Sequence, residues 1–365
     1  MLSSMDDYPL HQIPDVIRHV GTSDRNFYDR YYFNLHATSG ELCLIMGLGQ
    51  YPNLGVQDAF ALVRRGREHR VLRASRALGD RMDTSVGPLR VEVLEGLRRL
   101  RVCAGPNEHG LELDLVFEGA MPAFEEPRQY IRRRGRVLFD TMRFAQTGRW
   151  SGWLRVAGEE IAITPARHWG TRDRSWGIRP VGEPEPPGIR AGELPLDGMW
   201  NYAPMQFDGF SILYMCHERP TGERPLEEGV RIFADPERAP EWLGAPQHAH
   251  VFRRGTRCIE RSTLSFPAAP GGLLAVEVTP LLPVYVGIGT GYGFDADWRH
   301  GAYQGPLVVQ GVLLDAEQDK ARLWGLCDAV ARFEIPGHVG YGLFEYGLFG
   351  PMPRYGFKEF LDGAP

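Results

Sequence analysis

The sequence has no apolar run long enough to form a membrane-spanning helix. Such a helix needs about 18 to 20 consecutive apolar residues. The longest apolar stretch, 281–289 (LLPVYVGIG), has the length of a strand and contains Pro and Gly. The first residues, MLSSMDDYPLHQIP, lack the basic start and apolar core of a signal peptide. We therefore expect neither a membrane span nor a secretory leader.

Cysteine is scarce, and the cysteines do not form pairs. Their number is odd, and no C-x-x-C spacing occurs. Disulfide frameworks and cysteine-based zinc sites both depend on paired cysteines. The pattern favours a reduced, cytoplasmic protein with buried thiols at five positions: Cys43, Cys103, Cys216, Cys258 and Cys327.

Neither sign of charge dominates the chain. It has 41 Lys and Arg residues against 46 Asp and Glu residues, which gives a formal net charge of −5. A mildly acidic protein has no general attraction for nucleic acid. The short basic run at 132–134 is typical of a solvated strand edge or loop, so we expect no nucleic-acid partner.

Helical periodicity over more than about ten residues is nearly absent. The 44 Gly and 28 Pro residues are spread along the chain and would interrupt helices every few residues. Apolar and polar residues alternate instead, as they do in antiparallel strands. We expect short helical turns only near 13–20 and 232–244. Strands are predicted within 89–105, 111–119, 152–164, 209–218, 248–255, 273–280, 306–315 and 321–330.

The length of 365 residues suits two domains. Residues 181–198 are rich in Pro and Gly and contain almost no apolar run, which is typical of a linker. We predict an all-β protein with one antiparallel domain at 1–180, a linker at 181–198 and a second antiparallel domain at 199–365. The two halves show no sequence repeat.

The familiar motifs of cofactor and nucleophile sites are missing. The glycine-rich stretch 287–293 (GIGTGYG) does not match G-x-G-x-x-G, and no helix is predicted after it. Neither a Walker sequence nor a G-x-S-x-G elbow occurs. His248 and His250 would share one face of a strand, but no other ligand type lies close in sequence. We expect no metal site.

One segment, 168–180 (HWGTRDRSWGIRP), combines many polar groups with two Trp residues directly before the predicted linker. Segments at such a junction often line a cleft between domains. In a regular strand, alternate residues share a face. One face would then carry Trp169, Thr171, Asp173 and Ser175, and the other His168, Arg172, Arg174 and Trp176.

This alternation leaves two alternatives open. Either Asp173 or the pair of Arg172 and Arg174 faces the interior, unless a bulge brings both in. The segment is equally consistent with an ion-pair and cation–π joint that only holds the domains together. Guanidinium groups aimed at Asp173 would lower its pKa. A general acid at this position requires an apolar pocket away from at least one arginine.

Two further clusters combine aromatic and polar residues. In 338–357, a strand would place Tyr341 and Glu345 on one face, and a carboxyl group among aromatics has a raised pKa. In 199–207, Trp200 and Tyr202 open the second half. Both clusters also fit ordinary strands with core aromatics.

The order of these features resembles a known superfamily. An antiparallel half, the motif D-x-x-W-G at 173–177, a Pro-rich linker and a second half opening with W-x-x are similar to the tandem lipocalin-like superfamily of carotenoid hydratases, AttH-like proteins and fungal Diels–Alder cyclases. The stretches 22–34 (TSDRNFYDRYYFN), 51–56 (YPNLGV) and 172–177 (RDRSWG) resemble an uncharacterised bacterial branch of it more closely.

The resemblance implies two lipocalin-like β domains, a hydrophobic pocket at their junction and no cofactor. It matches Asp173 to the motif acid and Trp176 to the motif aromatic. The sequence departs from the hydratase pattern, because Arg174 stands where that pattern has a His directly after the acid. The neighbouring guanidinium favours the carboxylate and suits a substrate with an anionic or carbonyl group.

Two hypotheses for the function follow. The first is a cofactor-independent enzyme that hydrates, dehydrates or cyclises a hydrophobic terpenoid, steroid-like or polyketide molecule by acid/base chemistry. The second is a binding protein or carrier for such a molecule, in which the motif is a structural clasp. The sequence indicates no oligomeric state. The enzyme would use Asp173 as acid or base, Glu345 as reserve acid and a substrate-binding set of Arg172, Arg179, Trp176, Trp200, Tyr202, Tyr341 and His168.

Overall fold

The computed structural model describes residues 2–133, 135–184, 197–319, 322–323, 325–360 and 362–365 of the chain. Within these residues the secondary structure consists of β-strands and three short 3-10 helices at Ser4–Asp7, Pro52–Leu54 and Pro353–Tyr355. The predicted all-β fold is confirmed. The helical turns expected near 13–20 and 232–244 do not form, because both segments follow bends and turns and the second contains a short strand.

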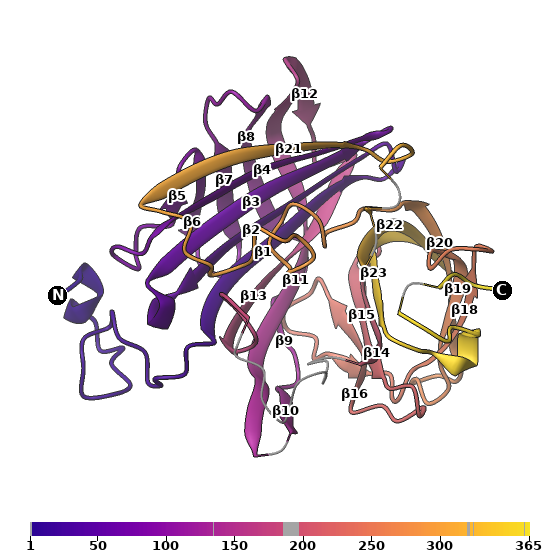
Figure 1. Cartoon of the computed structure of the whole chain (residues 1–365). Helices are drawn as coiled ribbons and strands as arrows, with labels where there is room; N and C mark the ends of the chain where they lie inside the picture. Colours follow the sequence, from indigo (N-terminus) through magenta and orange to yellow (C-terminus); the bar gives the residue numbers. More distant parts are fainter. Residues whose placement is uncertain (1, 134, 185–196, 320–321, 324, 361) are drawn as a thin grey trace.

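The first sheet has 14 antiparallel strands and contains most of the N-terminal half of the chain. Leu111, Leu113, Leu115 and Phe117 are buried on one face of their strand, as the alternation predicted. They belong to a core around which the sheet curls (Figure 1). The strands run in the order β21 (Leu307–Asp315), β4 (Glu68–Ala77), β3 (Val56–Arg65), β2 (Leu42–Tyr51), β1 (Phe27–Ala37), β13 (His168–Ile178), β11 (Arg136–Val156), β8 (Leu111–Gly119), β7 (Arg99–Ala104), β6 (Leu89–Glu95) and β5 (Ser85–Val86), with β9 (Phe124–Glu125), β10 (Gln129–Arg133) and β12 (Glu159–Ile163) paired to β11.

The second sheet has nine antiparallel strands and curls into a nearly closed barrel (Figure 1). Met352, Phe357 and Ala364 of the C-terminal segment belong to its apolar core. The strands run in the order β17 (Glu241–Trp242), β16 (Leu226–Phe233), β15 (Phe210–Glu218), β14 (Gly198–Gln206), β23 (His338–Phe349), β22 (Leu326–Ile335), β20 (Leu274–Leu282), β19 (Ile259–Phe266) and β18 (Gln247–Phe252).

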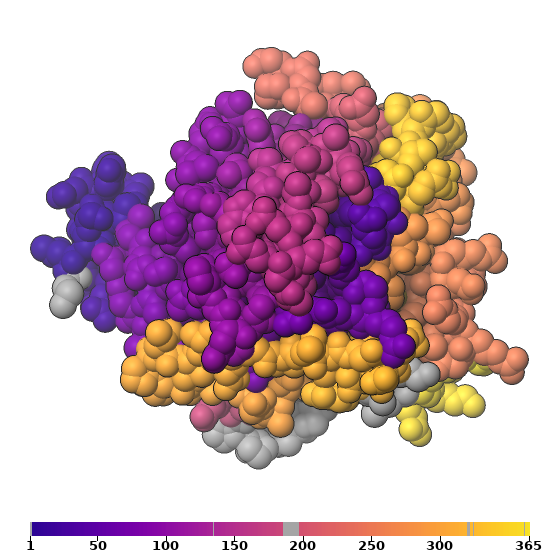
Figure 2. All heavy atoms as spheres, turned by 90° about the horizontal axis from the view of Figure 1, so that it is seen from above, coloured from indigo at the N-terminus to yellow at the C-terminus, as the bar shows by residue number. Residues whose placement is uncertain are grey.

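Strand β21 connects the two halves of the chain. It follows β20 of the barrel in sequence but pairs along its full length with β4 of the first sheet. Figure 2 shows the orange atoms of this segment running along the edge of the purple atoms of the first sheet. The predicted domain boundaries stay a prediction, and residues 185–196 of the predicted linker lie outside the described residues.

A shared apolar cluster joins the two sheets. Ile45, Phe60 and Val71 of the first sheet pack with Trp200 and Leu343 of the second. Near this cluster, β13 contacts β23 and β11 contacts β14. The outer faces of the two sheets are therefore buried against each other, and side chains on those faces are removed from water.

The close packing of β13 onto β1 gives a stability prediction. A Cβ atom at Gly170 would lie 2.0 Å from the Asn34 carbonyl oxygen and 2.6 Å from Trp150 Nε1. That oxygen already accepts a hydrogen bond from Trp150 Nε1 at 2.9 Å. We expect Gly170→Ala to lower the free energy of unfolding by about 3 kcal/mol or more, because backbone and a buried indole must both move.

Chemical denaturation followed by Trp fluorescence measures this loss. Gly96→Ala is the matched control, since nothing lies within 4 Å of a Cβ atom there. Equal stability of the two variants would contradict the packing described for β13.

Candidate active site

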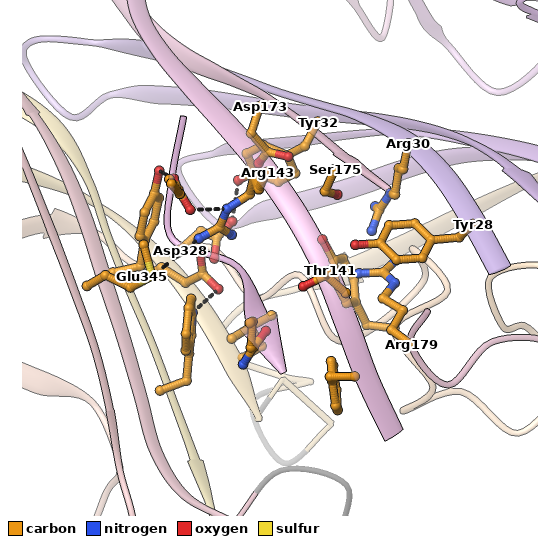
Figure 3. A pocket seen from close by; sticks show the side chains of 18 of the residues that line it. Tyr28, Arg30, Tyr32, Thr141, Arg143, Asp173, Ser175, Arg179, Asp328 and Glu345 are labelled. Carbon is orange, nitrogen blue, oxygen red and sulfur yellow. Dashed lines mark hydrogen bonds and ion pairs between the residues drawn. The ribbon is translucent and has the colours of Figure 1, made fainter. Parts of the chain in front are cut away.

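A cavity of about 410 Å³ lies between the two sheets. Strands β1, β11 and β13 form one wall and β14, β15, β22 and β23 the other, and the segment 291–300 covers one end (Figure 3). Its lining includes Tyr28, Arg30, Tyr32, Glu126, Thr141, Arg143, Asp173, Ser175, Arg179, Trp200, Tyr202, Tyr292, Asp328 and Glu345.

Strand alternation directs Asp173 into this cavity. Thr171, Asp173 and Ser175 all line it, so this face of β13 looks inward. Asp173 is paired across β1 with Tyr32, and Ser175 with Arg30. Of the two alternatives for this strand, it is therefore Asp173, and not the pair of Arg172 and Arg174, that faces the cavity.

The opposite wall presents a second row of polar groups. Glu345 on β23 is paired with Tyr202 on one side and with Asp328 on the other. Trp200 Nε1 donates a hydrogen bond of 2.8 Å to Glu345 Oε1. The Tyr32 hydroxyl donates a short hydrogen bond to Asp328 Oδ2 and so bridges the two sheets. Three carboxyl groups therefore converge on one cavity.

Burial raises the pKa values of these three carboxyl groups. Loss of water raises the pKa of Asp173 from 3.8 to about 6, although the Arg143 guanidinium partly offsets this. Burial raises the pKa of Asp328 to about 7 against the opposing hydrogen bond from Tyr32. Burial and the charge of Asp328 raise the pKa of Glu345 well above 4.5. Burial therefore favours the protonated form of all three groups.

A second bridge between the sheets holds Arg143 in place. Its Nε donates to Glu126 Oε2 at 2.5 Å, and the Tyr202 hydroxyl donates to Glu126 Oε1 at 2.9 Å. The guanidinium carbon lies 4.6 Å from the centre of the Tyr202 ring. Arg143 therefore has its own carboxylate partner and leaves Asp173 without a neutralising ion pair among the described residues.

The other end of the cavity is basic. Figure 3 shows Arg30, Arg179, Tyr28, Thr141 and Ser175 there, away from the carboxyl groups of Asp328 and Glu345. The cavity is thus divided into an end with proton-bearing carboxyl groups and an end with guanidinium groups.

A model of a family of unknown function (DUF8625) matches residues 2–358 of the chain. The chain belongs to this family. No curated protein matches the sequence.

Two solved structures share most of the fold. An AttH-type protein from Nitrosomonas europaea is 12% identical, with a TM-score of 0.56 over 88% of this chain and 92% of its own. Kievitone hydratase from Nectria haematococca is 13% identical, with a TM-score of 0.53 over 87% of this chain and 88% of its own. The predicted resemblance to tandem lipocalin-like proteins is confirmed at the level of the fold.

The structure brings five of the predicted site residues to the cavity, namely Asp173, Glu345, Arg179, Trp200 and Tyr202. The pKa of Asp173 was expected to be lowered by its sequence neighbours, and it is raised instead. The reason is geometric, because neighbours in a strand point to opposite faces.

Arg172 and Trp176 lie on the opposite face of β13, outside the cavity lining. Arg172 is buried, donates to Gln146 at 2.9 Å and lies over the Phe144 ring. The Trp176 ring packs edge-on against Phe144 and is 38% exposed. This half of the motif makes cation–π and ring contacts to β11 of the same sheet, not the joint between domains that was the alternative interpretation.

Tyr341 and His168 also lie outside the cavity lining. Tyr341 packs edge-on against Trp169, with ring centres 5.7 Å apart. His168 is buried at the start of β13, where its Nδ1 lies 3.0 Å from the backbone nitrogen of Thr164. The contact between Trp169 and Tyr341 joins β13 of the first sheet to β23 of the second.

The sequence reasoning did not select Asp328, Tyr32, Arg143, Glu126 and Arg30. A detectable signal existed for Asp328, because it shares a strand face with apolar Leu326 and Val330, and a lone carboxylate on such a face is unusual. The pairing of Arg143 with Glu126 and Tyr202 carried no local signal, since the three come from separate segments.

Histidine and cysteine meet inside the barrel rather than at the cavity. Ligand atoms of Cys216, Glu218 and His248 lie within 4.8 Å of one another. However, the Glu218 carboxylate already accepts hydrogen bonds from Arg224 at 2.9 Å and Arg354 at 3.0 Å. Two guanidinium groups oppose a cation there, and the cluster fastens the C-terminal segment to the barrel. No helix among the described residues is both long and apolar enough to cross a membrane.

The raised pKa of Asp328 predicts a pH-dependent stability. The folded protein binds this proton more tightly than the unfolded chain, so the stabilising contribution is complete below about pH 4 and is lost as the pH rises through 7. Asp328→Asn does not titrate and keeps an oxygen that accepts from Tyr32. Between pH 4.5 and 7.5 we expect wild type to lose about 1–3 kcal/mol more unfolding free energy than this variant.

Urea denaturation at the two pH values measures the difference. Asp208→Asn, at an exposed position, is the control and should behave as wild type. The same pH dependence in Asp328→Asn and wild type would show that Asp328 is not protonated by burial.

Proposed function

We propose that this protein is a cofactor-independent acid–base enzyme that adds water to, removes water from, or cyclises a hydrophobic small molecule bound between the two sheets. The observation that carries the proposal is the convergence of three carboxyl groups, each with a raised pKa, on one cavity that is also lined by aromatic rings. A carboxyl group whose pKa is raised toward neutral pH is suited to act as a general acid or base.

Glu345 is the proposed acid. Burial and the charge of Asp328 raise its pKa well above 4.5, which favours the protonated form. Trp200 donates to its Oε1 atom, which leaves Oε2 as the oxygen that carries the proton. Asp173 is the proposed base, because its pKa of about 6 makes it mainly ionised at pH 7 and no described residue donates a hydrogen bond to it.

The two groups together complete a dehydration. The proton of Glu345 passes to a substrate hydroxyl, the C–O bond breaks and water leaves. The Asp173 carboxylate takes the proton from the adjacent carbon, and the electron pair of that C–H bond forms the C=C bond. Hydration is the same sequence in reverse, and the two carboxyl groups exchange their protonation states in each direction.

The aromatic lining supports a reaction with positive charge developing on carbon. The rings of Trp200 and Tyr202 stack at 6.3 Å beside Glu345, and aromatic faces attract cations. Arg143 would oppose such charge, but Glu126 neutralises it. Kievitone hydratase has the same fold, which supports hydration as one reaction that this architecture accommodates.

The proposal predicts loss of turnover without loss of fold in Asp173→Asn and Glu345→Gln. Both amides keep the size of the side chain but neither transfers a proton, so we expect the rate to fall about 10²- to 10⁴-fold. The assay incubates the protein with a panel of hydroxylated and unsaturated terpenoids, steroids and polyketides in D₂O. Mass spectrometry then detects gain or loss of water, cyclised isomers and deuterium on carbon.

Glu260→Gln is the control, because Glu260 is exposed on β19 far from the cavity lining. Full turnover by Asp173→Asn would remove Asp173 from the mechanism. Saturable binding of a panel compound with no turnover by wild type would favour the carrier hypothesis instead.

A further inference from the structure

The cavity is lined by the guanidinium groups of Arg30, Arg179 and Arg299, none of which has a carboxylate partner in an ion pair among the described residues, and Arg30 and Arg179 lie together at its basic end (Figure 3). Arg30 and Arg179 both line the cavity, and neither forms an ion pair with a described residue. We propose that this end binds an oxyanion of the substrate, a carboxylate or phosphate. The substrate would then be an amphipathic organic anion. This inference rests on the proposed function and specifies its substrate class.

Arg30 is buried between aromatic rings and a glycine that leaves room for its guanidinium group. It is 3% exposed, and its Nη2 atom makes no hydrogen bond to a described residue. Its guanidinium carbon lies 4.8 Å from the Tyr292 ring centre and 5.6 Å from that of Phe60. A Cβ atom at Gly47 would lie 2.7 Å from Arg30 Nη2, so the absence of a side chain there leaves room for the guanidinium.

Arg179 is oriented by a neutral histidine. Nε2 of His300 lies 2.8 Å from the Thr290 carbonyl oxygen, which only accepts, so Nε2 carries the hydrogen. The other nitrogen, Nδ1, is therefore free to accept from Arg179 Nη2 at 3.4 Å. Burial lowers the pKa of His300 well below 6.5, so the ring stays uncharged beside the guanidinium. The guanidinium carbon lies 4.4 Å from the Tyr28 ring centre.

Asp58 and Asp173 lie close enough to interact electrostatically with these two arginines, but neither acid forms a direct ion pair with them. Asp58 accepts hydrogen bonds from the Tyr51 hydroxyl at 3.1 Å and from the Gly301 backbone at 2.7 Å, and it forms no ion pair with Arg30. Asp173 lies two residue pairs further along the sheet than Ser175, the partner of Arg30, and it forms no ion pair with Arg30. By contrast, the third arginine of this wall, Arg143, has Glu126 at 2.5 Å.

Burying a cation without an anion is costly unless a ligand supplies the anion. Two guanidinium groups suit an oxyanion with two or more oxygens. Ser175 and Thr141 lie at the same end and add hydroxyl donors (Figure 3). An anionic head group held there would leave the apolar body of the substrate to extend toward Asp173 and Glu345.

Calorimetric titration with three matched probes tests the proposal: naphthalene-2-carboxylate, 2-naphthyl phosphate and the neutral 2-naphthylmethanol. We expect at least one anionic probe to bind about 10- to 100-fold more tightly than the alcohol at pH 7.5, because charge-assisted hydrogen bonds give the difference. The preferred anion tells carboxylate from phosphate. Arg30→Met and Arg179→Gln should each remove most of the preference while leaving the affinity for the alcohol within about twofold.

Arg238→Gln is the matched control, because Arg238 also lies over an aromatic ring, that of Phe233, but on the surface of the barrel. Thermal denaturation gives a second readout. An unpaired buried Arg30 predicts that ligand-free Arg30→Met melts at a higher temperature than wild type, whereas a structural clasp predicts a lower one.

Equal affinity of wild type for the anions and the alcohol would overturn the proposal, as would an anion preference that survives in both variants. Absence of anion binding to wild type would overturn it as well. None of these results bears on the proposed catalytic roles, because Asp173→Asn tests turnover independently of Arg30 and Arg179. If wild type and Arg30→Met turned over neutral compounds at the same rate, the proposed anion site would be wrong and the proposed acid–base chemistry would stand.

Discussion

The site depends on the removal of water from carboxyl groups between two packed sheets. Asp328 is 1% exposed and is approached by one donor, the Tyr32 hydroxyl of the other sheet. Burying ionised carboxylates is costly, so the protein takes up protons instead. The apolar cluster containing Phe60 and Trp200 holds the sheets together against this cost. Without that contact between sheets, Asp328 and Glu345 would be ordinary surface acids.

The two-residue period of the strands sorts the polar groups by function. On β13, the face toward the second sheet presents Asp173 and Ser175 to the cavity. The opposite face carries Arg172, which lies over an aromatic ring, and Arg174, which forms an ion pair with Asp29. The contacts of Arg172 and Arg174 all lie within the first sheet, so these two residues do not form a joint between the two halves of the chain. The paired carboxylate of Glu126 keeps Arg143 from neutralising Asp173, so a cavity rich in arginine still contains carboxyl groups with raised pKa values.

Alternation and turn residues predicted the all-β fold, because they report local burial and each strand carries its own signal. The sequence patterns also selected Asp173 and Glu345 as candidate site residues, and both line the cavity. The arginines next to Asp173 in sequence suggested a lowered pKa for its carboxyl group. They do not lower it, since adjacent residues of a strand point to opposite faces. The partnership of Tyr32 with Asp328 spans 296 positions and exists only after both sheets have packed. The pairing of β21 with β4 is likewise a long-range contact without a local pattern.

Infrared difference spectroscopy of the carboxyl groups tests the central claim most directly. The account predicts that wild type at pH 7 shows the C=O stretching band of a protonated carboxyl group. This band should weaken in Glu345→Gln, which leaves only the contribution of Asp328 with its pKa of about 7, and it should stay unchanged in Glu260→Gln, since Glu260 is exposed. A wild-type spectrum without a protonated carboxyl band at pH 7 would contradict the account.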